Sequence, residues 1–341
     1  MDTVFFLAHT EADGSLSKAS LEALTAAKAL AAGLGAPLGL GLFGADVTAA
    51  AAAVAGCGAA AVFGVSGEAF GLPRYATDAA AMEALCQAGG ATIVIAADDS
   101  RASRALPGVA ARLGGRIDAH VTGLAVKDGK PVATRGFYRQ RMQAELTRAG
   151  RPWCLTVSAG CFAAYDGVPG EASVTAVDVP VTPALTRTSV KAVIAPSADE
   201  QTIRPDATLL FVTGAGWTKK QADGAPHVAE AGELILGFLG KSKASLGSSK
   251  SLVDMGGEGE AVLPFLTHLH QVGQTGATPR HPKGLATCCH GEEPHVVGWR
   301  FIAERRAVNL DASCGWAQGK ADVLYVADAF AVMKKINELL G

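Results

Sequence analysis

The segment Gly247–Asp254 combines residue types that bind anions. Its sequence, GSSKSLVD, places three serine hydroxyls and the Lys250 ammonium in a turn of otherwise small residues. Such a turn can donate several N–H and O–H hydrogen bonds to an anion, and Lys250 adds a point charge. The same residues would also form a plain polar loop, so this segment alone leaves both readings open.

A second segment, Gln271–Gly276, has the sequence QVGQTG. Its two glycines permit close approach of the backbone to a ligand. Gln274 and Thr275 supply donors and acceptors that suit the edge of a heterocycle. An ordinary turn would have a similar composition, so the spacing gains meaning only together with other motifs.

Two further glycine motifs are weaker evidence for a nucleotide-binding site. Gly214–Gly216 follows a predicted strand, as a dinucleotide-binding loop does, but Lys219 stands where the third glycine of that fingerprint belongs. Gly237–Ser242 resembles a phosphate-binding loop with too few residues between its glycines, so we expect a helix that ends at Gly240.

Cysteine and histidine residues gather near residue 290 and suggest a metal or thiol site. Cys288 and Cys289 precede His290, and His295 and Cys314 follow. Adjacent cysteines rarely bind one zinc ion together, and the sequence contains no C-x-x-C pair. A thiol or metal enzyme that uses this group is therefore a minor alternative.

The first half of the chain alternates strand and helix patterns, which predicts a mostly parallel sheet with helices on both faces. A strand-rich stretch over Ile117–Phe162, with a turn at Lys127–Gly129, follows this alternation. The expected strands are Val4–Ala8, Leu38–Phe43, Ala60–Val65 and Thr92–Ala96, and the expected helices are Ser17–Leu34, Val47–Ala55, Tyr75–Ala88 and Ser103–Leu113.

A boundary between two α/β domains is expected near residues 180–205, where prolines interrupt a polar stretch. The alternation then restarts. The elements expected in the second half are the strands Leu209–Thr213 and Val323–Val326 and the helices Val228–Leu239 and Ala329–Leu340. The predicted fold class is α/β, with two Rossmann-like doubly wound domains at residues 1–190 and 205–341.

Composition excludes several classes of protein. The net charge of −2 leaves no basic field for a phosphate backbone, so we expect no nucleic-acid partner. Residues 47–67 carry no charge, but they are mostly Ala and Gly, so a soluble helix and a buried strand fit better than a membrane span. No targeting signal is evident, and seven irregularly spaced cysteines fit reduced thiols, so a cytoplasmic location and no membrane insertion are expected.

Five motifs of the second half, in order and with nearly the family's spacing, resemble the alpha subunit of electron transfer flavoproteins. The family patterns are G-x-S-R-x-x-V-D, Q-V-G-Q-T-G, S-G-x-x-Q-H, A-I-N-x-D and V-A-D-L-F. The corresponding segments here are Gly247–Asp254, Gln271–Gly276, His290–His295, Ala307–Asp311 and Val326–Phe330. The first half resembles the family's amino-terminal domain more faintly, for example at Leu155–Phe162.

The resemblance implies that the C-terminal domain binds one FAD and that the N-terminal, nucleotide-hydrolase-like domain binds no nucleotide. It implies a heterodimer with a beta-type subunit that carries single electrons from flavin dehydrogenases to a quinone oxidoreductase or respiratory acceptor. Such a protein is an electron carrier rather than an enzyme with its own substrate. The cofactor-binding residues carried over from the motifs are Ser249, Lys250, Gln271, Val272, Gly273, Gln274, Thr275, His290, Gly291, His295, Asn309 and Asp328.

The resemblance also implies roles for these residues. Ser249 and Lys250 would approach the flavin ring, Thr275 would lie near N5, and His295 would face the O2 side of the pyrimidine. Asn309 and Asp328 would hold the adenosine end. A cation and hydrogen-bond donors in a pocket of low dielectric constant stabilise the negative charge that a flavin acquires with an electron.

The chain departs from the family pattern at several of these positions. Lys250 replaces an arginine, which keeps the charge but loses the planar fork. Gly216 stands where an arginine near the cofactor's phosphates is expected, and Lys219 or Lys220 is a candidate substitute. His290 and Pro294 replace a serine and a glutamine. These departures define a second alternative, a structural subunit of the same fold without flavin.

Overall fold

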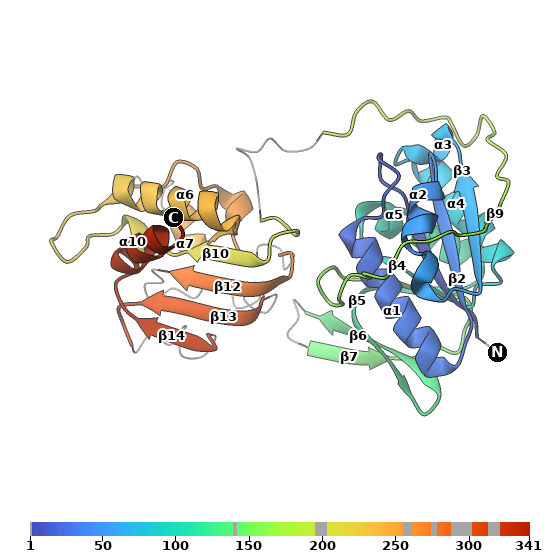
Figure 1. Cartoon of the computed structure of the whole chain (residues 1–341), viewed down its shortest axis with the longest axis horizontal. Helices are drawn as coiled ribbons and strands as arrows, with labels where there is room; N and C mark the ends of the chain where they lie inside the picture. Colours follow the sequence, from blue (N-terminus) through green and yellow to red (C-terminus); the bar gives the residue numbers. More distant parts are fainter. Residues whose placement is uncertain are drawn as a thin grey trace. The chain divides into compact units, whose positions relative to one another are not determined.

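The computed structural model describes residues 2–138, 142–194, 203–254, 261–273, 278–287, 302–312 and 321–341. The chain divides into two compact units, Met1–Ile194 and Ala195–Gly341, each with its own sheet and hydrophobic core (Figure 1). Both units are of the mixed α/β type, as the sequence predicted.

The sheet of the first unit has the strand order β7-β6-β5-β8-β4-β1-β2-β3-β9. Neighbouring strands are parallel except at the pairs β5–β6 and β6–β7. The strands are β1 (Val4–His9), β2 (Leu38–Gly44), β3 (Ala61–Ser66), β4 (Ile93–Ala97), β5 (Arg116–Lys127), β6 (Lys130–Phe137), β7 (Met142–Leu146), β8 (Trp153–Val157) and β9 (Val174–Ala176).

Helices cover both faces of this sheet (Figure 1). Alternate residues of β1 enter different cores: Val4 and Phe6 pack with α1, whereas Phe5 and Leu7 pack with α4 and α5. A strand that is buried on both faces reads as a continuous apolar run, which explains its clear signal in the sequence. The helices are α1 (Lys18–Leu34), α2 (Thr48–Ala53), α3 (Glu68–Gly71), α4 (Tyr75–Ala88) and α5 (Ser100–Arg112), with a 3₁₀ turn η1 at Ala55–Cys57.

Helix α1 shows how local sequence sets an element's limits. The Ser17 side chain accepts a hydrogen bond from the Ser20 N–H, and the helix ends at Gly35, whose φ of 60° is the left-handed conformation that favours glycine.

The turn predicted at Lys127–Gly129 joins β5 to β6, with Asp128 at φ 51° and Gly129 at φ 69°. Helix α2 is shorter than the predicted Val47–Ala55.

The second unit contains a five-stranded sheet, all parallel, with the order β11-β10-β12-β13-β14. One face packs against α6 and α10 around Phe211, Trp217 and Met333, and a smaller core lies on the other face. The strands are β10 (Leu209–Thr213), β11 (Ser245–Ser248), β12 (His281–Thr287), β13 (Ile302–Asn309) and β14 (Val323–Val326). The helical segments are α6 (Val228–Ser242), α7 (Lys250–Asp254) and α10 (Ala329–Leu339), with 3₁₀ turns η3 (Ala215–Thr218) and η5 (His268–His270).

The prediction that the first helix of this unit ends at Gly240 is wrong. Helix α6 continues to Ser242, and Lys243 takes the left-handed conformation at its end, with φ 56°. The Lys243 N–H donates to the Leu239 carbonyl at 3.0 Å, so the chain closes the helix without a glycine.

Candidate functional site

The polar segments of the second unit meet at the carboxyl ends of its parallel strands. Ligands of open α/β sheets bind outside these ends. Thr213, Ser248, Thr287, Asn309 and Val326 are the last residues of the five strands. The predicted residues Ser249 and Lys250 follow directly after β11, and Asp328 follows shortly after β14. This edge of the sheet is therefore the candidate functional site.

Residues Gly247–Lys250 form a tight junction between β11 and α7. The Ser249 N–H donates to the Thr213 carbonyl at 2.8 Å, and the Leu252 N–H donates to Ser249 Oγ at 3.3 Å. Ser249 is therefore buried and caps the first turn of α7. The ends of β10 and β11 are thus tied together at the residue that precedes Lys250.

Lys250 lies at the surface of this junction, with about half of its side chain exposed to solvent. Its ammonium forms a salt bridge with Asp254, four residues further along α7, and His268 Nε2 lies 2.9 Å from the other oxygen of that carboxylate. The hydrogen bond from Lys250 is the main cause that holds the pKa of Asp254 below its usual value, although burial opposes it. The positive charge of Lys250 is thus partly neutralised by its own helix.

The two glycine-rich segments that the sequence singled out lie against each other. The Val272 N–H donates to the Ser248 carbonyl at 3.0 Å, and Ser248 and Gln271 form an isolated parallel bridge. A Cβ atom at Gly247 would lie 2.6 Å from Val272 Cγ2, so only glycine allows this approach. Gly273, at φ 79°, donates its N–H to Thr278 Oγ1 at 2.6 Å.

Ser248 adds a feature that the sequence analysis missed. Its side chain is completely buried, and its Oγ has no hydrogen-bond partner among the residues that the structure describes. An unsatisfied buried hydroxyl costs about 1–3 kcal/mol of stability, so such groups are rare unless a ligand completes them. The family pattern allows any residue at this position, which is why the motif gave no signal for it.

Asn309 and Asp328 line a small pocket together with Gly216 and Gln221. The Asp328 carboxylate accepts a hydrogen bond from the Phe330 N–H at 3.0 Å and caps α10. The buried Asn309 carbonyl accepts one from the Ala327 N–H at 3.1 Å. The structure therefore brings together two residues that lie nineteen positions apart in the sequence and joins them to the loop after β10.

Several predicted residues lie outside the described residues: Gln274, Thr275, His290, Gly291 and His295. The same holds for Cys288, Cys289 and Cys314 of the alternative thiol or metal site. Within the described part of the chain, no group of three His, Cys, Asp or Glu side chains could hold a metal ion.

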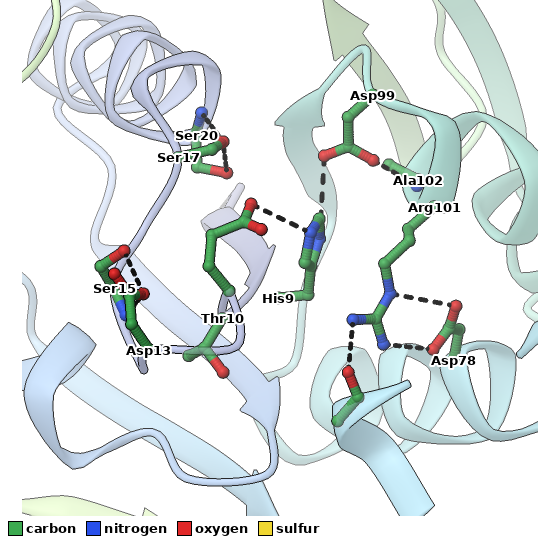
Figure 2. Close-up of polar contacts among 12 residues, drawn as sticks. His9, Thr10, Asp13, Ser15, Ser17, Ser20, Asp78, Asp99, Arg101 and Ala102 are labelled. Carbon is green, nitrogen blue, oxygen red and sulfur yellow. Dashed lines mark hydrogen bonds and ion pairs between the residues drawn. The ribbon is translucent and has the colours of Figure 1, made fainter. Parts of the chain in front are cut away.

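The first sheet has its own polar cluster at its carboxyl edge, which the sequence analysis also missed. Figure 2 shows the His9 ring, at the end of β1, directed toward Asp99, which follows β4. His9 Nδ1 lies 3.7 Å from Asp99 Oδ2, and His9 Nε2 lies 3.6 Å from Glu11 Oε1. Burial lowers the pKa of His9, although the Asp99 carboxylate opposes the change. Burial therefore favours the neutral form of the imidazole.

This cluster lies where the strand order reverses, because β2 pairs with one side of β1 and β4 with the other. Nucleotide phosphates bind at such points against the N-terminus of a helix. Asp99 fills that place itself, since its carboxylate accepts a hydrogen bond from the Ala102 N–H at 2.8 Å. The nearby Arg101 guanidinium pairs at 2.6 Å with the buried Asp78 (Figure 2). The edge is therefore closed by its own charged groups.

Comparison with known families settles the class of the protein. Residues 4–184, more than half of the chain, match the family model described as the electron transfer flavoprotein domain. The chain belongs to the electron transfer flavoprotein family. No curated protein matches it significantly. The match covers the unit built on the nine-stranded sheet, whereas the motifs that first suggested this family lie mainly in the second unit.

Among the described residues, no helix has the length and apolar character needed to cross a membrane.

Proposed function

We propose that this chain is the alpha-type subunit of an electron transfer flavoprotein and that its second unit, residues 205–341, binds FAD. In this proposal it pairs with a beta-type subunit in the cytoplasm. It passes single electrons from flavin dehydrogenases to a quinone oxidoreductase or another respiratory acceptor. The observation that carries the proposal is the convergence of Gly247–Lys250 with Gln271–Gly273 at the carboxyl edge of the second sheet.

The chemistry of this edge suits a flavin nucleotide. Ser248 offers a buried hydroxyl without a hydrogen-bond partner among the described residues, and Gly247 allows Val272 to pack closely against the end of β11. Gly216, in the turn after β10, lies beside Asn309 and Asp328 in the lining of the small pocket. Polar groups of these kinds, gathered outside the carboxyl ends of parallel strands, suit a planar ring system that carries a nucleotide tail.

Bound FAD would supply the one-electron chemistry, and the protein would position and tune it. We propose that Ser249 and Lys250 approach the ring, and that Gln271, Val272 and Gly273 line its edge. Gln274, Thr275, His290, Gly291 and His295 are proposed from the motifs alone. Asn309 and Asp328 are proposed to bind the ribose and adenine.

The proposed role of Lys250 requires a change of partner. In this structure its ammonium is held by Asp254, so the charge available to a neighbouring ligand is reduced. An exposed i,i+4 pair of this kind contributes only about 0.3–0.5 kcal/mol, so a ligand with developing negative charge would readily displace it. In this proposal, Lys250 pairs with Asp254 when FAD is absent and turns toward the flavin when FAD is bound.

The decisive experiment is coexpression with a beta-type subunit, followed by visible spectroscopy of the purified complex. We expect flavin absorbance near one FAD per heterodimer, and release of FAD on denaturation. The matched pair of variants is Asn309→Ala, which should lower FAD occupancy, and Lys335→Gln, at an exposed position of α10, which should not. A folded but colourless heterodimer would replace this proposal with that of a structural subunit without flavin.

A further inference from the structure

The carboxylate of Asp254 has two partners, and one of them lies outside the motifs that suggested the cofactor site. Oδ2 accepts a hydrogen bond from the Lys250 ammonium, and Oδ1 lies 2.9 Å from Nε2 of His268. Because an ionised carboxylate only accepts hydrogen bonds, Nε2 is the donor in the second contact. In the described part of the chain, these are the side chains that contact this carboxylate. Asp254 therefore divides its negative charge between an ammonium and an imidazole.

The backbone of the turn η5 holds His268 in this place. The residues at the two ends of the turn, Thr267 and His270, cap each other, and the His270 ring accepts from the Thr267 N–H at 3.1 Å. Gln271, which follows the turn, forms a bridge with Ser248 at the end of β11. Helix α7 also begins just after β11. The carboxylate and the imidazole are thus anchored to the same strand by different segments.

This arrangement makes the release of Lys250 easier. The Asp254 side chain is 28% exposed, and a partly buried charged group that loses its donors is destabilised. If Lys250 turns away, His268 still donates to Oδ1, so the carboxylate keeps one partner. Without His268, more negative charge would remain on the carboxylate and would hold the ammonium more firmly.

We propose that His268 is a positioning residue for Lys250 and that it thereby raises the reduction potential of the flavin. This inference rests on the function proposed above, in which Lys250 turns toward the ring. No covalent bond forms or breaks in this movement. The ammonium keeps its protons and exchanges Asp254 for a flavin that has gained one electron from a donor dehydrogenase. His268 meanwhile stays with Asp254 and stabilises its charge.

Competitive acetylation of lysine side chains, read by mass spectrometry, tests the contact in the flavin-free chain. Exposed ion pairs of this kind shift an equilibrium about twofold. We therefore expect His268→Leu to slow acetylation of Lys250 about twofold and Asp254→Asn to accelerate it. His268→Gln should keep nearly the unaltered rate, because its side-chain amide can donate in place of Nε2. Lys335, which pairs with Glu338 on α10, is the internal reference.

Potentiometric titration of the heterodimer measures the consequence for the flavin. His268→Leu should lower the equilibrium constant for uptake of the first electron about twofold, which is a fall of about 20 mV at about 59 mV per tenfold change. In the Lys250→Gln background the same substitution should have no effect, because the ammonium that His268 positions is gone. Leu269→Ala alters the exposed neighbour in η5 and is the control for a general disturbance of the turn.

The possible results distinguish this inference from the proposed function. A heterodimer that binds FAD but keeps its potential in His268→Leu would overturn the inference alone. An equal fall in the Lys250→Gln background would do the same, because His268 would then act without Lys250. An unchanged acetylation rate of Lys250 in His268→Leu would overturn it in the flavin-free chain. A folded, colourless heterodimer would overturn the proposed function, and the tuning role of His268 with it.

Discussion

At the scale of single residues, Lys250 is the side chain whose role is most open to measurement. Lys250 follows Ser249 at the start of α7, and its ammonium forms a salt bridge with Asp254. A nearby positive charge stabilises a flavin that has gained an electron, so it raises the reduction potential. The structural observation that matters is that Asp254 competes for this charge.

Lys250→Gln should lower the first reduction potential of the bound flavin. A loss of about 1.4 kcal/mol in one-electron stabilisation corresponds to about 60 mV. Lys250→Arg should keep flavin binding and shift the potential by less, because the charge remains while its geometry changes. Potentiometric titration of the heterodimer measures both values, with Lys335→Gln on the outer helix α10 as the control. Equal potentials in the Lys250→Gln and unaltered proteins would refute this role.

The neighbouring serines 248 and 249 should respond to alanine in opposite directions. Ser248→Ala removes a buried hydroxyl that has no partner in the described part of the chain, and it should raise the free energy of unfolding of the flavin-free chain by about 1 kcal/mol. Ser249→Ala removes the cap of α7, where Oγ accepts from the Leu252 N–H, and should lower it by about 1 kcal/mol. Chemical denaturation of flavin-free protein measures both changes.

Ser248→Ala also tests whether a ligand forms a hydrogen bond with the Ser248 hydroxyl. If the hydroxyl binds the cofactor, Ser248→Ala should stabilise the flavin-free chain but weaken retention of FAD. A destabilised flavin-free Ser248→Ala protein would show instead that the hydroxyl has a partner within the fold.

At the scale of elements, the network around Asp118 joins β5 to β8. The Trp153 indole N–H donates to Asp118 Oδ2 at 2.9 Å, and the Arg148 guanidinium donates to both carboxylate oxygens at 2.8 Å. Burial opposes ionisation of Asp118, yet these hydrogen bonds outweigh it and keep its pKa below the usual value. The network therefore ties the antiparallel arm of the sheet to its parallel part.

Asp118→Asn should lower the free energy of unfolding by about 2–3 kcal/mol, since it leaves a buried indole and a guanidinium without their charged partner. Because the folded pKa is depressed, the contribution of Asp118 is complete above the pKa of an unfolded carboxyl group, about 3.9. It is lost as pH falls through the lower folded value. Acid titration of stability should therefore be shallower in the variant, and parallel curves would contradict the assignment.

Elements with strong local signals could be predicted from the sequence, and those that depend on tertiary context could not. Helix α4 begins and ends where expected, at Tyr75 and Ala88, and β14 agrees in full. Strands β12 and β13 were not predicted. His281–Thr287 contains Pro282 and Gly284, which weaken any strand pattern, and β13 carries a charged run at Glu304–Arg306. Their neighbours in the parallel sheet impose the extended conformation.

In the candidate site, too, some features had a local sequence signal and others depend on tertiary packing. The two glycine segments at Gly247 and Gln271 were found from composition, but their contact depends on sheet order, which no local pattern specifies. The buried Ser248 hydroxyl and the Lys250–Asp254 salt bridge are likewise properties of packing. The cluster at His9 was missed because His9 ends one strand, Asp99 follows another, and the two lie ninety positions apart in the sequence.

At the scale of the whole molecule, the two units have separate sheets and separate hydrophobic cores. The family match lies in the first unit, and the proposed cofactor site lies in the second. Stability and ligand binding should therefore be distributed unequally along the chain, because a ligand stabilises only the cooperative unit that binds it.

Calorimetry of the chain should accordingly resolve two unfolding transitions. Asp118→Asn should move only the transition of the first unit, and Ser249→Ala only that of the second. Saturating FAD at a hundredfold excess over its dissociation constant should stabilise the second unit by about 2.7 kcal/mol, with the first transition unchanged. A single transition that all three perturbations shift together would show instead that the units unfold as one body, and FAD acting on the first transition alone would move the proposed cofactor site to the other sheet.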